Sequence, residues 1–249
     1  MGDFKQSLRN QAIKFYLNGI YPSILRHRAK KIGRKDKIEV VFFAMNVAMW
    51  RYQGVYELLS QDNRFNCHIV FTVPRTFSDE QKAADLQQMR EYFDARGIQY
   101  VDFDFSKPDG SDVKKLINPD ILFYPQPYED FPSNHDFNGF TSKLLCYMNY
   151  SVNVAKGDFW IYDLRFHNLA WKVYCPTTSE KENAQRMARN HGRNWVVSGY
   201  TNLDYYFGHL YFHYYFYYHF LLYYYYFFRF FYYLLEFEFL NLNLNFQIL

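Results

Sequence analysis

The stretch Ile38-Glu39-Val40-Val41-Phe42-Phe43-Ala44-Met45 decides the fold. Glu39 is its one charged residue, and the rest is a nearly continuous apolar run. A strand with one solvent-facing side alternates apolar and polar residues, whereas a strand covered on both faces reads as an unbroken apolar run. We therefore predict a strand buried on both faces, which is typical of parallel sheets.

Strands and helices alternate along the rest of the chain. Apolar residues with helical spacing over 52–59 predict a first helix. Ser78 followed by Gln81 is a capping box that opens a second helix, and Gly97 ends it. This alternation predicts an α/β fold with a Rossmann-like parallel sheet over residues 38–204. Further strands are predicted at 67–73, 98–103, 120–124, 144–148 and 195–198, and a charged helix at 179–190.

The last 45 residues, 205–249, have an aberrant composition. They contain 24 aromatic residues, including the run Tyr223-Tyr224-Tyr225-Tyr226-Phe227-Phe228. Most of their residue types come from codons rich in A and T, as expected when AT-rich DNA is read out of frame. We interpret this aromatic tail as the product of a frameshift. The alternatives are a membrane span over 205–228, which carries no formal charge, and a natural low-complexity segment.

The first 37 residues form a basic leader. Ten Lys or Arg stand against two Asp here, giving a net charge of +8 against −5 for the rest of the chain. Apolar residues recur at roughly helical spacing, with Gly19 and Pro22 as interruptions. A basic amphipathic helix of this kind binds an anionic membrane surface. The alternative is a solvated helix that packs on the domain by its apolar side.

Missing motifs exclude several chemistries. The turn at 45–50 has no glycine, so it does not form the tight pyrophosphate turn of a dinucleotide-binding fold. No GxxxxGK loop, zinc-protease motif or paired cysteines occur, so we predict no cofactor and no metal. Cys67, Cys146 and Cys175 are widely spaced and odd in number, which favours a reducing, cytosolic setting. We expect no nucleic-acid partner, because the basic residues are confined to one terminus without a recognition motif.

Polar and aromatic residues follow three predicted strands, at the positions where open parallel sheets bind ligands. Arg51 is a candidate phosphate clamp, and Trp50 is a candidate stacking surface. The structural alternative is that Trp50 and Tyr52 cap the sheet while Arg51 is solvated. The candidate substrate-binding residues are Asn46, Trp50, Arg51, Tyr52, Gln126, Tyr128, Asn149 and Ser151.

His167 is the candidate general base, because imidazole exchanges protons near neutral pH. It lies within the aromatic stretch 159–171. The alternative is therefore a hydrogen-bonded packing residue.

The order of several short segments resembles a known family. The segments are Tyr21-Pro22, Ile38 to Phe43, Trp50 to Leu59, Asp62 to Phe65, Asp120 to Pro127, Leu145 to Tyr147 and Val197 to Asp204. Together they resemble the N-terminal half of bacterial proteins of the CDP-glycerol glycerophosphotransferase family, of the teichoic-acid-polymerase type. The resemblance covers about residues 15–204.

The resemblance implies a GT-B architecture, in which two Rossmann-like domains face a cleft. It implies peripheral association with the inner face of the cytoplasmic membrane. The implied reaction transfers glycerol phosphate from CDP-glycerol to a polyol or sugar acceptor in cell-surface polymer synthesis. An acceptor hydroxyl attacks the β-phosphorus, CMP leaves, and a histidine is the expected base.

Two departures from the family pattern stand out. The family's histidine-glycine motif is replaced by Asn149-Tyr150-Ser151. The second domain, which is expected to hold the donor nucleotide, would need far more than the 45 residues of the tail. We therefore expect the 249-residue chain to be inactive as a transferase. Two alternatives remain, namely the N-terminal half of a nucleotide-sugar GT-B glycosyltransferase and a non-catalytic membrane-associated binding module.

Overall fold

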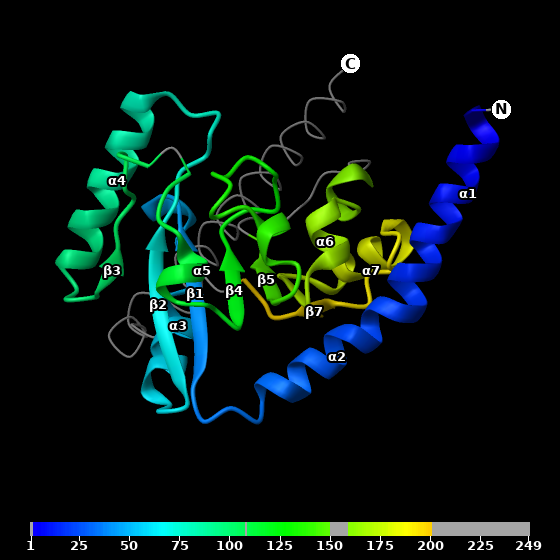
Figure 1. Cartoon of the computed structure of the whole chain (residues 1–249), viewed down its shortest axis with the longest axis horizontal. Coiled ribbons are helices and arrows are strands. Elements are labelled where there is room, and N and C mark those ends of the chain that lie inside the picture. The colour runs from blue at the N-terminus through cyan, green and yellow to red at the C-terminus, as the bar shows by residue number, and fades with distance from the viewer. Residues whose placement is uncertain (1, 108, 150–158, 201–249) are drawn as a thin grey trace, which may run out of the picture. The chain divides into compact units, whose positions relative to one another are not determined.

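Parallel strands form a seven-stranded sheet in the order β3-β2-β1-β4-β5-β6-β7 (Figure 1). The structure is a computed structural model that describes residues 2–107, 109–149 and 159–200, and these residues belong to one compact unit. Every adjacent pair of strands runs in parallel, so the predicted Rossmann-like α/β fold is confirmed. The strands are β1 (Ile38–Ala44), β2 (Phe65–Phe71), β3 (Tyr100–Val101), β4 (Ile121–Tyr124), β5 (Leu144–Met148), β6 (Lys172–Cys175) and β7 (Trp195–Val197).

The apolar run of β1 supplies side chains to both faces of the sheet. Val41 and Phe43 belong to one core cluster, whereas Val40 and Phe42 belong to another. This division follows from the period of two in a strand, and it confirms the prediction of burial on both faces. Phe42 stacks on Phe123 of β4 with ring centroids 4.7 Å apart. Burying one such side chain contributes about 2–3 kcal/mol to folding.

Helices cover both faces of the sheet. α3 (Gln53–Gln61) and α4 (Asp79–Asp94) pack against the cluster that contains Phe42. α5 (Val113–Leu116), α6 (Arg165–Leu169) and α7 (Thr178–Met187) contribute to the cluster that contains Phe43. The start of α4 is the predicted one, because the Ser78 hydroxyl accepts a hydrogen bond from the Gln81 N–H at 3.2 Å.

One predicted strand is shorter than expected, and one observed strand was not predicted. The strand expected at 98–103 is only the two-residue edge strand β3, which has a neighbour on one side only. The strand β6 was not predicted, because Lys172-Val173-Tyr174-Cys175 is short and follows directly on the aromatic stretch 159–171.

The basic leader is helical through its two interruptions. α1 (Gly2–Phe15) continues into a π-helical turn, η1 (Tyr16–Ile20), and then into α2 (Tyr21–Ile32). Pro22 has no N–H to donate to the Asn18 carbonyl four residues earlier, and a local widening to π geometry accommodates such a defect. Arg193 supplies the missing donor, with its Nη1 2.7 Å from the Asn18 carbonyl oxygen.

The two halves of the leader have different environments. Leu17, Tyr21 and Leu25 are buried against Leu144 of β5 and its neighbours, and the Tyr21 hydroxyl donates to the Leu169 carbonyl at 2.8 Å. From Lys5 onward the side chains of α1 are exposed by contrast, except for the half-buried Ile13, and Phe15 at the end of the helix is 70% exposed. The packed alternative therefore holds for α2. Within the described ranges, no helix combines the length and apolarity needed to cross a membrane. The aromatic tail lies outside the described residues.

Candidate ligand site at the carboxyl edge of the sheet

The topology creates a switch point between β1 and β4. The chain runs outward from β1 through β2 to β3, and then continues from β4 in the opposite direction. The loops that follow β1 and β4 consequently diverge, and ligands of open α/β sheets bind in the crevice between such loops. The residues after β1, β4 and β5 are therefore the ones to examine.

Arg51 connects the loop after β1, the loop after β4 and the end of β5 by hydrogen bonds. Its side chain is 4% exposed, and its Nε donates to the Met148 carbonyl at 2.7 Å. Its Nη1 donates to the Met49 carbonyl at 2.9 Å, and its Nη2 donates to the Pro125 carbonyl. The alternative of a solvated Arg51 is thus wrong. The guanidinium group donates to main-chain carbonyls in the loops after β1 and β4 and at the end of β5, and so it holds this edge of the sheet together.

Trp50 and Tyr52 are packing residues in this structure. Tyr52 is fully buried, its hydroxyl donates to the Tyr124 carbonyl, and burial raises the pKa of its phenol. Trp50 packs edge-on against Phe93 of α4, and its Nε1 donates to the Gln53 side chain at 2.8 Å. Both rings are buried, so a ligand could not stack on them without a rearrangement of this edge.

Three of the remaining candidates at this edge already make hydrogen bonds within the protein. Asn46 is half-buried, and its Oδ1 accepts from the Met49 N–H at 2.9 Å. Gln126 is buried and donates to Asp130 Oδ1 at 2.7 Å, whereas Tyr128 is half-buried. Asn149 donates to Glu180 Oε2 at 3.2 Å. Ser151 lies outside the described residues.

Four charged residues at this edge were not identified from the sequence. Arg75, after β2, donates from its main-chain N–H to the Asp130 carbonyl at 2.6 Å and from its Nη2 to the Glu129 carbonyl at 3.0 Å. Arg165 Nη1 lies 3.6 Å from Glu129 Oε1. Burial raises the pKa of the Asp130 carboxyl group. The available signal was the acidic pair that directly follows Gln126-Pro127-Tyr128.

His167 lies in the core and not at the loop edge. It is 3% exposed, and its ring centroid lies 5.2 Å from that of Trp195 and 5.6 Å from that of Tyr147. Burial lowers its pKa to about 3, against weaker opposing effects of the Ile161 main chain and the Asp163 charge. Neither ring nitrogen makes a hydrogen bond of good geometry with a described residue. The ring is therefore inaccessible to a substrate in this structure, where it packs among aromatic residues as in the alternative to a general base.

The fold and this loop edge define an α/β domain of Rossmann-like type. No protein-family model and no curated protein matches the sequence. Solved structures that are similar include the UDP-GlcNAc 2-epimerase from Neisseria meningitidis bound to UDP-GlcNAc, at 15% identity and a TM-score of 0.44 over 68% of this chain and 47% of that chain. A putative UDP-N-acetylglucosamine 2-epimerase from Listeria monocytogenes is similar at 19% identity and a TM-score of 0.45, with the same coverage of 68% and 47%. The chain thus spans about half the length of these structures, and from so distant a likeness no function is inferred.

Proposed function

We propose that this domain is the N-terminal half of a GT-B-type transferase that moves glycerol phosphate from CDP-glycerol to a polyol or sugar acceptor. The observation that carries the proposal is the switch point between β1 and β4, where open parallel sheets bind their ligands. The order of the sequence segments supports the donor class, through their resemblance to the CDP-glycerol glycerophosphotransferases. The resemblance places the donor nucleotide in a second domain and leaves the acceptor to this one.

The charged residues at the carboxyl edge suit such a transfer. An acceptor hydroxyl would attack the β-phosphorus while its proton passes to the Asp130 carboxylate, and the bond to CMP would break. A raised pKa improves Asp130 as a base near neutral pH. Arg75 and Arg165 would neutralise phosphate charge by bidentate contacts. We therefore assign the proton transfer to Asp130 in preference to the enclosed His167.

Sequencing the gene across the codons for Ser198 to Phe216, and several hundred bases beyond, is the first test. A single inserted or deleted base that restores an ordinary frame with another α/β domain would supply the transferase for assay. A gene that encodes the tail as written would leave the non-catalytic module as the better interpretation.

CMP release is the test of activity. We expect none from the 249-residue chain with CDP-glycerol and glycerol, because the proposal places the donor in another domain. With a version that carries a second α/β domain, we expect release from CDP-glycerol but not from UDP- or GDP-sugars. Asp130→Asn should lower kcat by about 100-fold or more, as expected for loss of a general base. Asp36→Asn, an exposed site on the leader, is the matched control.

Peripheral membrane association is the second proposal, and the exposure of α1 favours it. Leu8 is 50% and Phe15 70% exposed on a helix that carries Lys5, Arg9 and Lys14. Such a helix would hold the domain on the inner face of the cytoplasmic membrane. In pelleting with anionic vesicles, Phe15→Glu should weaken binding about tenfold or more. Leu58→Glu is the control, because Leu58 on α3 is also 70% exposed but lies outside the leader.

A further inference from the structure

A pocket of about 370 Å³ opens at the amino edge of the sheet, opposite the switch point. It lies between the helical leader and the residues that precede β6 and β7. Its volume falls within the range of small-molecule sites, and its lining combines apolar side chains with amides and cations. The lining residues from the leader are Leu17, Tyr21, Pro22, Leu25 and Arg26, and those from the body are Asn168, Ala170, Trp171, Lys172, Asn190, Arg193 and Asn194.

The floor of the pocket is a network of buried amides. Asn194 Nδ2 donates to the His167 carbonyl at 2.7 Å and to the Ala170 carbonyl at 2.8 Å. Asn190 Nδ2 donates to Asn194 Oδ1 at 3.0 Å, and Asn168 Oδ1 accepts from the Asn190 N–H at 3.0 Å. These amides bond one another and the main chain. They therefore form a rigid floor and leave recognition of a charged ligand to the other polar groups.

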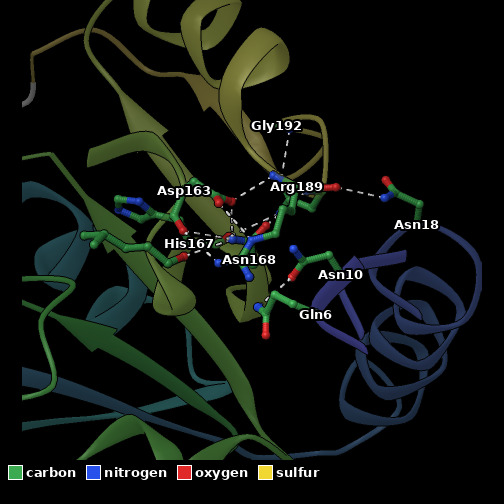
Figure 2. A network of polar contacts seen from close by, with 10 residues as sticks. Gln6, Asn10, Asn18, Asp163, His167, Asn168, Arg189 and Gly192 are labelled. Carbon is green, nitrogen blue, oxygen red and sulfur yellow. Dashed lines mark hydrogen bonds and ion pairs between the residues drawn. The ribbon is translucent and has the colours of Figure 1, made fainter. Parts of the chain in front are cut away.

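The helical wall is fastened to the same network. Figure 2 shows Asn18 reaching from the leader toward Arg189, whose side chain meets Asp163. Asn18 Nδ2 donates to the Arg189 carbonyl at 2.9 Å, and Arg189 Nε lies 2.8 Å from Asp163 Oδ2. Together with the bond from Arg193 to the Asn18 carbonyl, these contacts hold the π-helical turn against the body. Hydrogen bonds thus hold both the floor and the helical wall of the pocket in place.

Three cations line the pocket without an acidic partner. No carboxylate is among the lining residues, and Arg26, Lys172 and Arg193 form no ion pair with any residue that the structure describes. The Lys172 amine lies 5.9 Å from the Trp171 ring centroid, beside the apolar wall. Positive charge beside an apolar wall favours a ligand that is both anionic and apolar.

We propose that this pocket binds a phosphate ester with a short apolar chain. The phosphate would lie among Arg26, Lys172 and Arg193, because guanidinium and ammonium groups form charge-assisted hydrogen bonds with phosphate oxygens. The chain would lie against Leu17, Leu25 and Trp171. This site is independent of the proposed transferase reaction, since it lies at the other edge of the sheet and contains none of the residues assigned to that reaction.

Titration calorimetry on the full chain tests the proposal with three probes: hexyl phosphate, inorganic phosphate and hexanol. Burial of each methylene strengthens binding by up to about fourfold, so hexyl phosphate should bind at least about tenfold more tightly than inorganic phosphate. Hexanol lacks the anion and should not bind measurably. Equal affinities for hexyl phosphate and inorganic phosphate would overturn the proposal, because the apolar wall would then have no role.

Charge-removing variants locate the site. Lys172→Met and Arg26→Met should each weaken hexyl phosphate binding about tenfold, the usual effect of losing one charge-assisted hydrogen bond. Arg26 is exposed on α2, so its variant keeps the test valid if Lys172→Met fails to fold. Lys31→Met removes the same charge from an exposed site outside the pocket, and it should leave binding unchanged. Equal weakening by Lys31→Met and Arg26→Met would indicate general surface attraction and overturn the assignment.

Competition distinguishes the two sources of such a phosphate. Vesicles of phosphatidylcholine with phosphatidic acid present the group as a lipid headgroup. The competition is run in the Phe15→Glu background, which weakens the proposed attachment of α1 to anionic vesicles. Displacement of this protein from the vesicles by hexyl phosphate, with loss of vesicle binding on adding Lys172→Met, would support a lipid phosphate as the occupant. Hexyl phosphate binding without vesicle competition would support a soluble phosphate ester.

Discussion

The two edges of the sheet differ in what their polar side chains do. At the carboxyl edge, the Arg51 guanidinium donates to three main-chain carbonyls and is buried. At the amino edge, amides satisfy the main chain, while Arg26 and Lys172 have no ion-pair partner among the described residues. An arginine that follows a strand can thus either bond the main chain of neighbouring loops or bind a phosphate. A buried guanidinium group such as that of Arg51 takes the first role, whereas an exposed one is free for the second.

Two buried histidines extend this comparison. His135, in the loop after β4, bonds Thr72 Oγ1 at 2.9 Å and the Ser111 carbonyl at 3.0 Å. The carbonyl of His167 accepts a hydrogen bond from Asn194 in the amino-edge floor, while its ring nitrogens make no hydrogen bond of good geometry with a described residue. Burial lowers the pKa of His135 to about 4 and that of His167 to about 3.

Acidification from pH 7 to pH 5 should give the largest effect. The unfolded chain binds a proton at each histidine near pH 6.5, whereas the folded chain stays neutral down to about pH 4 at His135 and about pH 3 at His167. Because the unfolded state binds more protons in this window, stability falls as the pH falls. Between pH 7 and pH 5, each histidine should lower the free energy of unfolding by about 2 kcal/mol, and the two together should lower it by about 4 kcal/mol. Urea unfolding at pH 7, 6 and 5 measures this loss.

Carboxyl groups lose their contribution to stability only at a pH below this window. The pKa values of Asp62 and Asp104 are lowered to about 2, by the side chains of Arg64 and Lys107 respectively, so their effect begins as the unfolded carboxyls protonate near pH 4. A loss of only about 2 kcal/mol between pH 7 and pH 5 would show that one imidazole reaches solvent or a partner, and a flat stability would show that both do.

Replacing Arg51 by Met should have the next largest effect. The change leaves carbonyls of Met49, Pro125 and Met148 without their donor, so we expect a loss of about 3 kcal/mol in the free energy of unfolding. Arg165→Met, at an exposed arginine of the same edge, should change stability by less than about 0.5 kcal/mol. An Arg51→Met protein of normal stability that has lost ligand binding would return Arg51 to the role of a phosphate clamp.

Gly192→Ala tests the rigidity of the amino-edge floor. Gly192 has a φ of +56°, and an added Cβ would lie 2.7 Å from the Gln185 main-chain nitrogen. We expect a loss of about 2 kcal/mol in urea unfolding, from backbone strain and overlap. Gly54→Ala in α3 is the control, because its Cβ would meet no atom within 4 Å. That variant should be unchanged or up to about 1 kcal/mol more stable. Equal stability of Gly192→Ala and Gly54→Ala would show that the floor relaxes to accommodate the added Cβ.

The sequence predicted the sheet far better than the site. Strand β1 was evident because burial on both faces leaves a long apolar run, and the cap at Ser78 was evident because it is local. The π-helical turn was signalled only as an interruption at Gly19 and Pro22, since the donor that completes it comes from Arg193. The site depends on contacts between distant segments, such as Arg51 with Met148 or Arg75 with Asp130, and these contacts leave no local pattern.

His167→Leu should give the smallest effect, and it has the opposite sign. The substitution removes two buried nitrogens that make no hydrogen bond of good geometry from an aromatic environment, and it changes the side-chain volume little. We expect the free energy of unfolding at pH 7 to rise by about 1 kcal/mol, and the loss between pH 7 and pH 5 to fall by half. His135→Leu is the matched control: it should destabilise, because it leaves Thr72 and the Ser111 carbonyl unpaired. If His167→Leu instead destabilises as much as His135→Leu, then the His167 ring has a stabilising partner, such as the Ile161 main chain or a group beyond the described residues, and the contrast between the two histidines no longer holds.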